Sequence, residues 1–124
     1  MSKNVINTER LTLRPVLIGD TDDIHKYAGD KSIDMMLFLP NDTVEQTAEF
    51  VRNAVLQWAD KKPSVMEFVM LYDGRIIGGI GLEAVDEVTY EIGWVLSKEY
   101  RNKGFTTEAG KALLEYGFVV LSGG

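Results

Sequence analysis

The feature that constrains this chain most is a pair of apolar segments joined by Asp73-Gly74. Residues 66–72 are apolar and strand-like, and an Asp-Gly pair is typical of a two-residue hairpin turn. Residues 75–84 are therefore predicted to form the return strand of an antiparallel hairpin. This strand contains three glycines, which weaken a strand unless another backbone or a ligand must approach closely: Gly78, Gly79 and Gly81.

Another strand follows this hairpin, and one strand and two helices precede it. Asp86-Glu87 indicates a second turn, after which residues 88–96 continue the meander. Residues 10–15 alternate polar and apolar side chains, which predicts an N-terminal strand. Start signals and apolar spacing predict three helices: a short one from Asp20 as N-cap to Gly29, one from Val44 to Ala59 behind a Thr43–Gln46 capping box, and a final one from Thr106. The predicted order is β-α-α-β-β-β-α, an α+β (α/β) fold in one domain, residues 1–124, with a mixed, mostly antiparallel sheet flanked by helices.

The composition narrows the class of protein and ligand. A chain of 124 residues, 45% of them hydrophobic, suits one globular domain. Its net charge of -6 argues against binding nucleic acid through the overall field and suits a cationic partner such as an amine. No apolar run approaches the ~20 residues of a membrane helix. We therefore expect no membrane contact. The chain has no cysteine and a single histidine, His25, so we also expect a cytoplasmic protein with no metal site.

The segment from Trp94 to Ala109 carries the chemistry. It is predicted to be a strand end, a loop rich in cations with one glycine, and a helix N-terminus. The first turn of a helix has N–H groups without intrahelical acceptors and the positive end of the dipole, so an anion is stabilised there. Gly104 lets the backbone approach the anion, and Arg101 and Lys103 add charge at the rim. An ordinary strand–helix connection is the alternative.

Residues 101–106, Arg-Asn-Lys-Gly-Phe-Thr, resemble the Q/R-x-x-G-x-G/A pyrophosphate loop of the GNAT acyltransferases. Thr106 departs from the final Gly/Ala, at a position that often varies in the subgroup that acetylates ribosomal-protein N-termini. Three further segments are similar to parts of that subgroup: residues 9–15 to its opening strand, residues 90–96 to its fourth strand, and residues 105–109 to its helix entry. The resemblance covers essentially the whole chain.

The resemblance implies that acetyl-CoA is the co-substrate and that no acyl-enzyme forms. The pantetheine arm is expected along the fourth strand, at the backbone of Trp94, Val95 and Leu96. The pyrophosphate is expected on the loop, which supplies the remaining cofactor-binding residues: Arg101, Asn102, Lys103, Gly104, Phe105 and Thr106. The amine attacks the thioester directly, which agrees with the lack of cysteine.

A base must take a proton from the ammonium before it can attack. Strand alternation places Glu91 on one face with Thr89, Gly93 and Val95, and places Tyr90, Ile92, Trp94 and Leu96 on the other face. Glu91 is the first candidate base, and Glu83 on the neighbouring strand is the second. A solvated or salt-bridged strand acid is the alternative for both. Residues 35–40 are apolar without a clean period, which fits a loop that lines a cavity or one that only closes over the core.

The family continues with a fifth strand, another helix and closing strands, whereas this sequence ends at Gly124. We therefore expect an uncovered edge on the fourth strand, lost packing around Leu114, Phe118 and Leu121, and a homodimer that covers this surface. Two alternatives to an enzyme stay open: a non-catalytic CoA-binding or interaction module, and a structural remnant that dimerises. The amine also stays open, from peptide N-termini to polyamines and antibiotics.

Overall fold

The computed structural model describes residues 4–29, 43–60, 63–86 and 89–116. These residues form one antiparallel sheet of five strands in the order β1-β2-β3-β4-β5. The strands are β1 (Ile6–Asn7), β2 (Leu11–Pro15), β3 (Val65–Tyr72), β4 (Arg75–Ala84) and β5 (Tyr90–Leu96). The helices are α1 (Thr21–Ala28), α2 (Val44–Ala59) and α3 (Phe105–Tyr116), with 3-10 turns η1 (Ile18–Asp20) and η2 (Lys98–Tyr100). The predicted order is confirmed, and the two-residue strand β1 and the 3-10 turns add to it.

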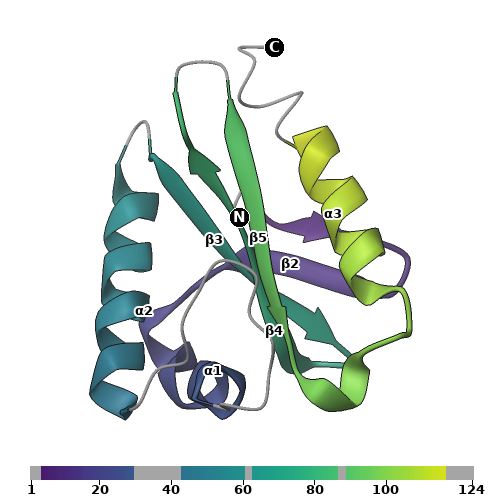
Figure 1. The fold of residues 1–124 in the computed structure, drawn as a ribbon, viewed down its shortest axis with the longest axis horizontal. Helices are drawn as coiled ribbons and strands as arrows, with labels where there is room; N and C mark the ends of the chain where they lie inside the picture. Colours follow the sequence, from purple (N-terminus) through teal and green to yellow (C-terminus); the bar gives the residue numbers. More distant parts are fainter. Residues whose placement is uncertain (1–3, 30–42, 61–62, 87–88, 117–124) are drawn as a thin grey trace.

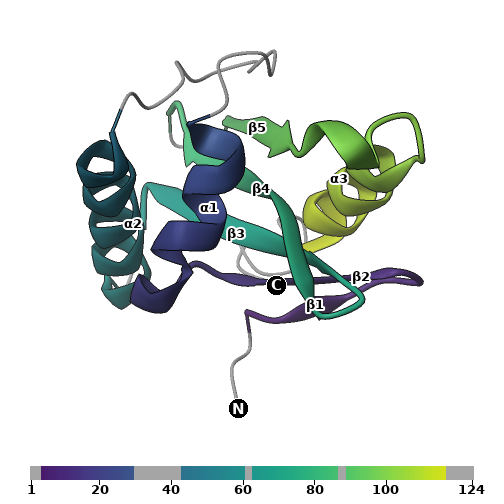
Figure 2. The same ribbon diagram turned by 90° about the horizontal axis from the view of Figure 1, so that it is seen from below.

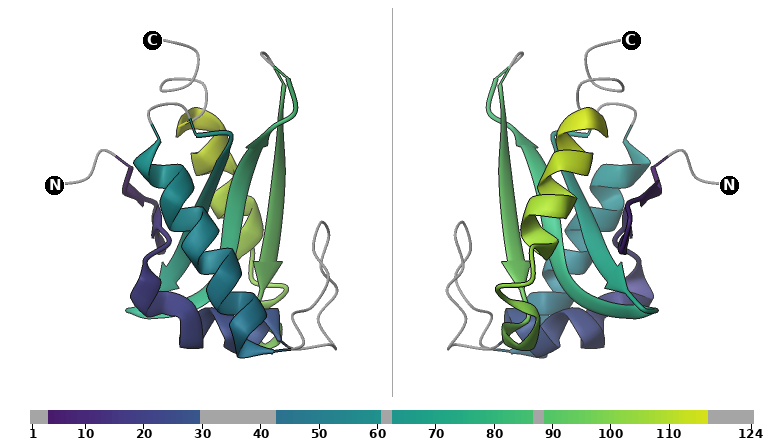
Figure 3. Two further views of the ribbon diagram at one scale, coloured as in Figure 1. Left: turned by 90° about the vertical axis from the view of Figure 1, so that its left-hand side faces the viewer. Right: turned by 90° about the vertical axis from the view of Figure 1, so that its right-hand side faces the viewer.

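The helices lie on opposite faces of the sheet, with α1 and α2 on one face and α3 on the other (Figures 1 and 2). The side views show α2 and α3 with the sheet between them (Figure 3). On the α3 face, Phe105, Ala109 and Leu113 pack on side chains from β2, β3 and β4. On the other face, Ile24, Tyr27 and Val51 pack on Val69 and Val95. Each face of the sheet therefore has its own apolar core.

The local start and turn signals act as predicted. Asp73 and Gly74 both have positive φ, 52° and 78°, which matches the type I′ hairpin geometry between β3 and β4. At the start of α2, the Thr43 hydroxyl accepts a hydrogen bond from the Gln46 N–H at 3.2 Å, and the Gln46 side chain accepts from the Thr43 N–H at 3.3 Å. This capping box satisfies two donors that the helix cannot satisfy itself.

Asp20 differs from its predicted role as a side-chain cap of α1. Asp20 stands at the N-cap position, but its side chain makes no capping hydrogen bond to the helix. Instead it accepts hydrogen bonds from the Arg14 guanidinium at 2.8 and 3.0 Å and from the Leu17 N–H at 2.8 Å. Burying a carboxylate without a charged partner costs more free energy than losing one helix cap, so Asp20 pairs with Arg14. This ion pair links β2 to the start of α1.

Some predictions fall outside the described residues: those for residues 35–40, Phe118 and Leu121. Residues 87–88 also lie outside, and β5 begins at Tyr90. Within the described part of the chain, no helix is long and apolar enough to cross a membrane.

Candidate functional site

The candidate site begins where β5 ends and α3 starts. After η2 the chain turns through Asn102 and Gly104, whose φ angles are 63° and 79°. This left-handed conformation suits glycine, and asparagine tolerates it better than most residues. Phe105 follows and is buried, with its ring centroid 4.7 Å from that of Tyr72 and 6.3 Å from that of Tyr100. These ring contacts of Phe105 hold the first turn of α3 against the sheet, whereas residues 102–104 before it are exposed.

The N-terminus of α3 has the geometry of an anion site. The Glu108 N–H donates to the Gly104 carbonyl at 3.0 Å. The N–H groups of residues 105–107 come before this bond, in the turn where a helix has donors left over and a partial positive charge. Gly104 is exposed, and it has no side chain of its own that could cover these donors. Arg101 is half-buried and Lys103 is exposed at the rim.

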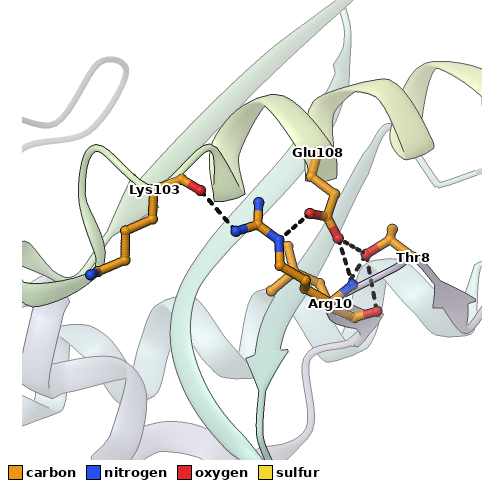
Figure 4. Close-up of polar contacts among 5 residues, drawn as sticks. Thr8, Arg10, Lys103 and Glu108 are labelled. Carbon is orange, nitrogen blue, oxygen red and sulfur yellow. Dashed lines mark hydrogen bonds and ion pairs between the residues drawn. The ribbon is translucent and has the colours of Figure 1, made fainter.

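A polar network holds this loop against the β1–β2 turn (Figure 4). The Arg10 guanidinium donates to the Glu108 carboxylate through Nε at 2.7 Å and to the Lys103 carbonyl through Nη1 at 2.8 Å. The backbone N–H of Arg10 and the Thr8 hydroxyl donate to the other oxygen of Glu108. Burial opposes ionisation of Glu108, but the hydrogen bonds from Thr8 and Arg10 outweigh it and lower the pKa of this carboxyl. Sequence reasoning missed this network because its members lie 93 to 100 residues apart.

Strand β5 places the predicted pantetheine-binding residues at the edge of the sheet. One edge of β5 pairs with β4, where Val95 faces Gly79 and Trp94 faces Ile80. No strand among the described residues pairs with the other edge. Val95 packs into the α1/α2 core, whereas Trp94 and Leu96 pack into the α3 core, so the predicted alternation of β5 is confirmed. The Val95 carbonyl is directed at β4, where it lies against Gly78, and the Ser97 N–H donates to the Ile77 carbonyl of β4 at 2.8 Å. Because backbone groups alternate in direction along an antiparallel strand, those of Trp94 and Leu96 face the open edge, where a ligand could lie as an extra strand would, whereas those of Val95 face β4.

The two candidate bases lie side by side. Glu83 on β4 and Glu91 on β5 are direct cross-strand partners, and both are exposed. Glu91 shares its strand face with Val95, the face covered by α1 and α2. The loop Arg101–Gly104 follows the opposite end of β5, so the acids and the anion site are separated by most of the strand.

Glu67 is an acid that sequence reasoning missed. It lies on β3 opposite Gly81, on the α1/α2 face, and a Cβ atom at Gly81 would overlap its carboxylate. Burial and the charge of Glu83 raise the pKa of Glu67 to about 7. Its signal in the sequence was an acid inside the apolar segment at residues 66–72.

The close approaches predicted at the β4 glycines are observed. A Cβ atom at Gly78 would overlap the Val95 carbonyl oxygen of β5, and one at Gly79 would lie 3.0 Å from the Tyr27 hydroxyl. Burial, then the charges of Glu67 and Asp20, raise the pKa of Tyr27 above its usual range. The glycines thus make room for polar groups of the α1/α2 face and for the neighbouring strand.

An open groove of about 590 Å³ lies on the α1 side of the same sheet end. Its lining includes the Arg14–Asp20 ion pair, Lys26, Arg75 and Ser97, and none of residues 101–106. His25, the single histidine, packs between helices, with Nδ1 2.7 Å from the Thr47 hydroxyl. In the residues that the structure describes, no group of three or more histidine, aspartate or glutamate side chains could hold a metal ion.

Comparison with known proteins places this geometry in a family. The model of the acetyltransferase (GNAT) domain matches residues 10–123. The uncharacterized N-acetyltransferase YnaD of Bacillus subtilis is 34% identical over 115 residues, which are 91% of this chain and 65% of that protein. The uncharacterized N-acetyltransferase p20 of Bacillus licheniformis is 28% identical over 118 residues, 93% of this chain and 66% of that protein. The chain spans about two thirds of the length of these relatives.

Solved structures agree in fold. A GNAT-family acetyltransferase from Bacillus anthracis has a TM-score of 0.76 and 30% identity, covering 95% of this chain and 68% of that one. An acetyltransferase from Salmonella typhimurium, described as modifying the N-terminal serine of a 50S ribosomal protein, has a TM-score of 0.80 at 16% identity, covering 92% and 67%. That identity shows the fold alone. With the family model matching nearly the whole chain, this protein belongs to the GNAT acetyltransferase family.

Proposed function

We propose that this chain forms the acetyl-CoA-binding part of an N-acetyltransferase acting on a primary amine, either a protein N-terminus or a small molecule. The observation that carries the proposal is the exposed Gly104 turn, which leads the open edge of β5 into the N-terminus of α3. A solved RimL, a ribosomal-protein acetyltransferase of the same fold, contains coenzyme A. The lack of cysteine agrees with direct transfer and with a reducing, cytoplasmic setting.

The residues present fit a CoA ligand. The N–H groups at the start of α3, with Asn102 and Gly104 in left-handed conformations, suit a diphosphate, and Arg101 and Lys103 add positive charge. The open edge of β5 offers the backbone groups of Trp94 and Leu96 to the pantetheine amides. Bound acetyl-CoA supplies an activated acetyl thioester.

The reaction needs the amine in its neutral form. Its nitrogen forms a bond to the thioester carbonyl carbon and gives up one further proton, the carbon–sulfur bond breaks, and the departing thiolate takes up a proton. We assign the removal of the ammonium proton to Glu91, directly or through a water molecule, and name Glu83 as the second candidate. The α1/α2 face, where Glu67, Glu83 and Glu91 gather near the start of β5, suits a cationic acceptor.

Calorimetric titration with CoA tests the binding site. Replacing Gly104 by Val forces a β-branched residue into a left-handed conformation, which costs roughly 1–2 kcal/mol unless the loop moves. We expect CoA binding to be lost. Gly74→Val is the control for backbone strain, because Gly74 has nearly the same φ, 78° against 79°, but lies in the β3–β4 hairpin turn, outside residues 101–106. Equal CoA affinity in the two variants would place the site elsewhere.

A thiol-release assay with acetyl-CoA and a panel of amines separates the enzyme from its alternatives. Turnover of any amine supports the transferase. CoA binding without turnover supports a non-catalytic binding module. Neither binding nor turnover supports a structural remnant. The control is the same assay without amine, which measures simple thioester hydrolysis.

A further inference from the structure

Arg10 makes an unusual number of contacts to a single turn for an exposed side chain. Its guanidinium bonds the Lys103 carbonyl and the Glu108 carboxylate, and its Cζ lies 4.3 Å from the centroid of the Phe105 ring. A Cβ atom at Gly104 would lie 3.4 Å from its Nη2 atom. Arg10 therefore contacts four residues around the start of α3: Lys103, Gly104, Phe105 and Glu108.

The bond to the Lys103 carbonyl determines where the next donor points. In a trans peptide the carbonyl oxygen and the following N–H point in opposite directions. Because the Lys103 oxygen is directed at Arg10, the Gly104 N–H is directed away from the β1–β2 turn. Figure 4 shows the guanidinium between the Lys103 carbonyl and Glu108, with the Lys103 amino group extending away from it. Glycine by itself would leave the direction of this N–H free, and the contact with Arg10 in the β1–β2 turn fixes it.

The contacts that Arg10 and Thr8 make to Glu108 offset the negative charge of this carboxylate beside the anion site. A carboxylate in the first turn of a helix stabilises the helix but would repel a second anion bound at the same end. Here the Glu108 oxygens accept from Thr8, from the Arg10 backbone and from the Arg10 guanidinium, so they are held on the side of the β1–β2 turn. The charge of Glu108 is offset by Arg10, which leaves the partial positive charge of the helix end for a ligand.

We infer that Arg10, anchored by Glu108 and Thr8, is a positioning residue for the diphosphate of the CoA ligand. It holds the Lys103–Gly104 peptide so that the loop donors face the anion, and it offsets the carboxylate nearest to them. The inference rests on the proposed function. It predicts that Arg10 matters for the diphosphate and not for the pantetheine arm, which lies along β5.

The test measures dissociation constants for CoA and for pantetheine, which lacks the diphosphate, by NMR titration of the parent and its variants. Arg10→Met keeps an apolar chain over Phe105 and removes the donors, and we expect about a tenfold loss of CoA affinity, the effect of one strong hydrogen bond. Pantetheine affinity should not change. Arg10→Lys keeps the charge but cannot bond both partners as a fork, so we expect it to recover only part of the loss. Glu108→Gln releases the anchor and should reproduce part of the Arg10→Met effect, with the double variant less than additive.

Lys26→Met is the matched control, since Lys26 is exposed and forms an ion pair with Asp23 on α1 at 3.2 Å. It should leave both affinities unchanged. An equal loss of CoA and pantetheine affinity in Arg10→Met, or full recovery by Arg10→Lys, would overturn the positioning role in favour of general stability or simple charge. Unchanged CoA affinity in both Arg10→Met and Glu108→Gln would overturn the inference alone. A parent chain that does not bind CoA would contradict the proposed function and the inference with it.

Discussion

Glu67 places an acid inside an otherwise apolar strand, and its environment makes the charged form unfavourable. Its partner on β4 is Gly81, which has no side chain that could pair with the carboxylate. Glu83, on the same face of β4, adds a negative charge nearby. The pKa of Glu67 rises from its ordinary 4.5 to about 7. A carboxyl that stays neutral in the folded protein at pH 6 but ionises in the unfolded chain makes folding take up a proton.

The stability of the protein is therefore expected to depend on pH through Glu67. Between about pH 4.5 and pH 7 the folded state holds more protons, so the free energy of unfolding falls as the pH rises through this range and then levels off. This rise in pKa corresponds to an upper limit of roughly 3–4 kcal/mol in the free energy of unfolding. Urea denaturation of the parent and of Glu67→Gln at pH 5 and pH 8 should show a smaller difference between the two pH values in the variant. Glu49→Gln, an exposed acid on α2, is the control and should behave as the parent does.

At the scale of elements, the pairing of β4 with β5 brings two like charges together. Glu83 and Glu91 stand directly opposite each other, a placement that costs a strand pair roughly 0.2–1 kcal/mol. The nearby α1/α2 core includes Val95 of the same strand. Since the arrangement weakens the sheet, we expect removal of either charge to leave thermal stability unchanged or slightly raised.

Glu83 and Glu91 lie at the opposite end of β5 from the anion site, so kinetics can separate the loss of a base from the loss of CoA binding. We expect Glu91→Gln to lower kcat about a hundredfold or more, the usual contribution of a general base, while CoA affinity stays the same. Glu83→Gln, which relieves the same repulsion, should lower the rate less. Thiol release gives kcat, and calorimetry gives the affinity. Equal rates in the parent and Glu91→Gln would instead indicate Glu83, Glu67 or water as the proton acceptor.

At the scale of the whole molecule, the open edge of β5 and the exposed part of α3 leave a surface that another chain could cover. In the described residues β5 ends the sheet, and Leu114 on α3 is 61% exposed. An unpaired strand edge presents a row of free donors and acceptors and recruits partners. We expect a homodimer that uses this surface.

Light scattering across a dilution series, with and without CoA, tests the dimer and its location. If the β5 edge forms the contact, CoA competes for the same backbone groups and should shift the equilibrium toward monomer. If α3 forms the contact, Leu114→Glu should break the dimer and CoA should have no effect. A monomer at every concentration, both with and without CoA, would contradict the prediction.

The local patterns of the sequence determined most of the elements. Asp73-Gly74, the Thr43–Gln46 capping box and the alternation of β2 act through neighbours a few residues away, so these predictions are confirmed. The glycine turn before α3 was also readable, since it needs only a left-handed residue between a strand and a helix. The family resemblance followed from such local segments kept in the right order.

Only the tertiary structure decided which distant side chains share an environment. Asp20 reads locally as a helix cap, but the fold brings Arg14 beside it, and the ion pair prevails. Glu67 reads as an interruption of an apolar strand until β4 places Gly81 under its carboxylate. Arg10 and Glu108, 98 residues apart, meet because β2 and α3 pack on the same face. Local propensity depends on near neighbours, whereas ion pairing and burial depend on distances that exist only once the chain has folded.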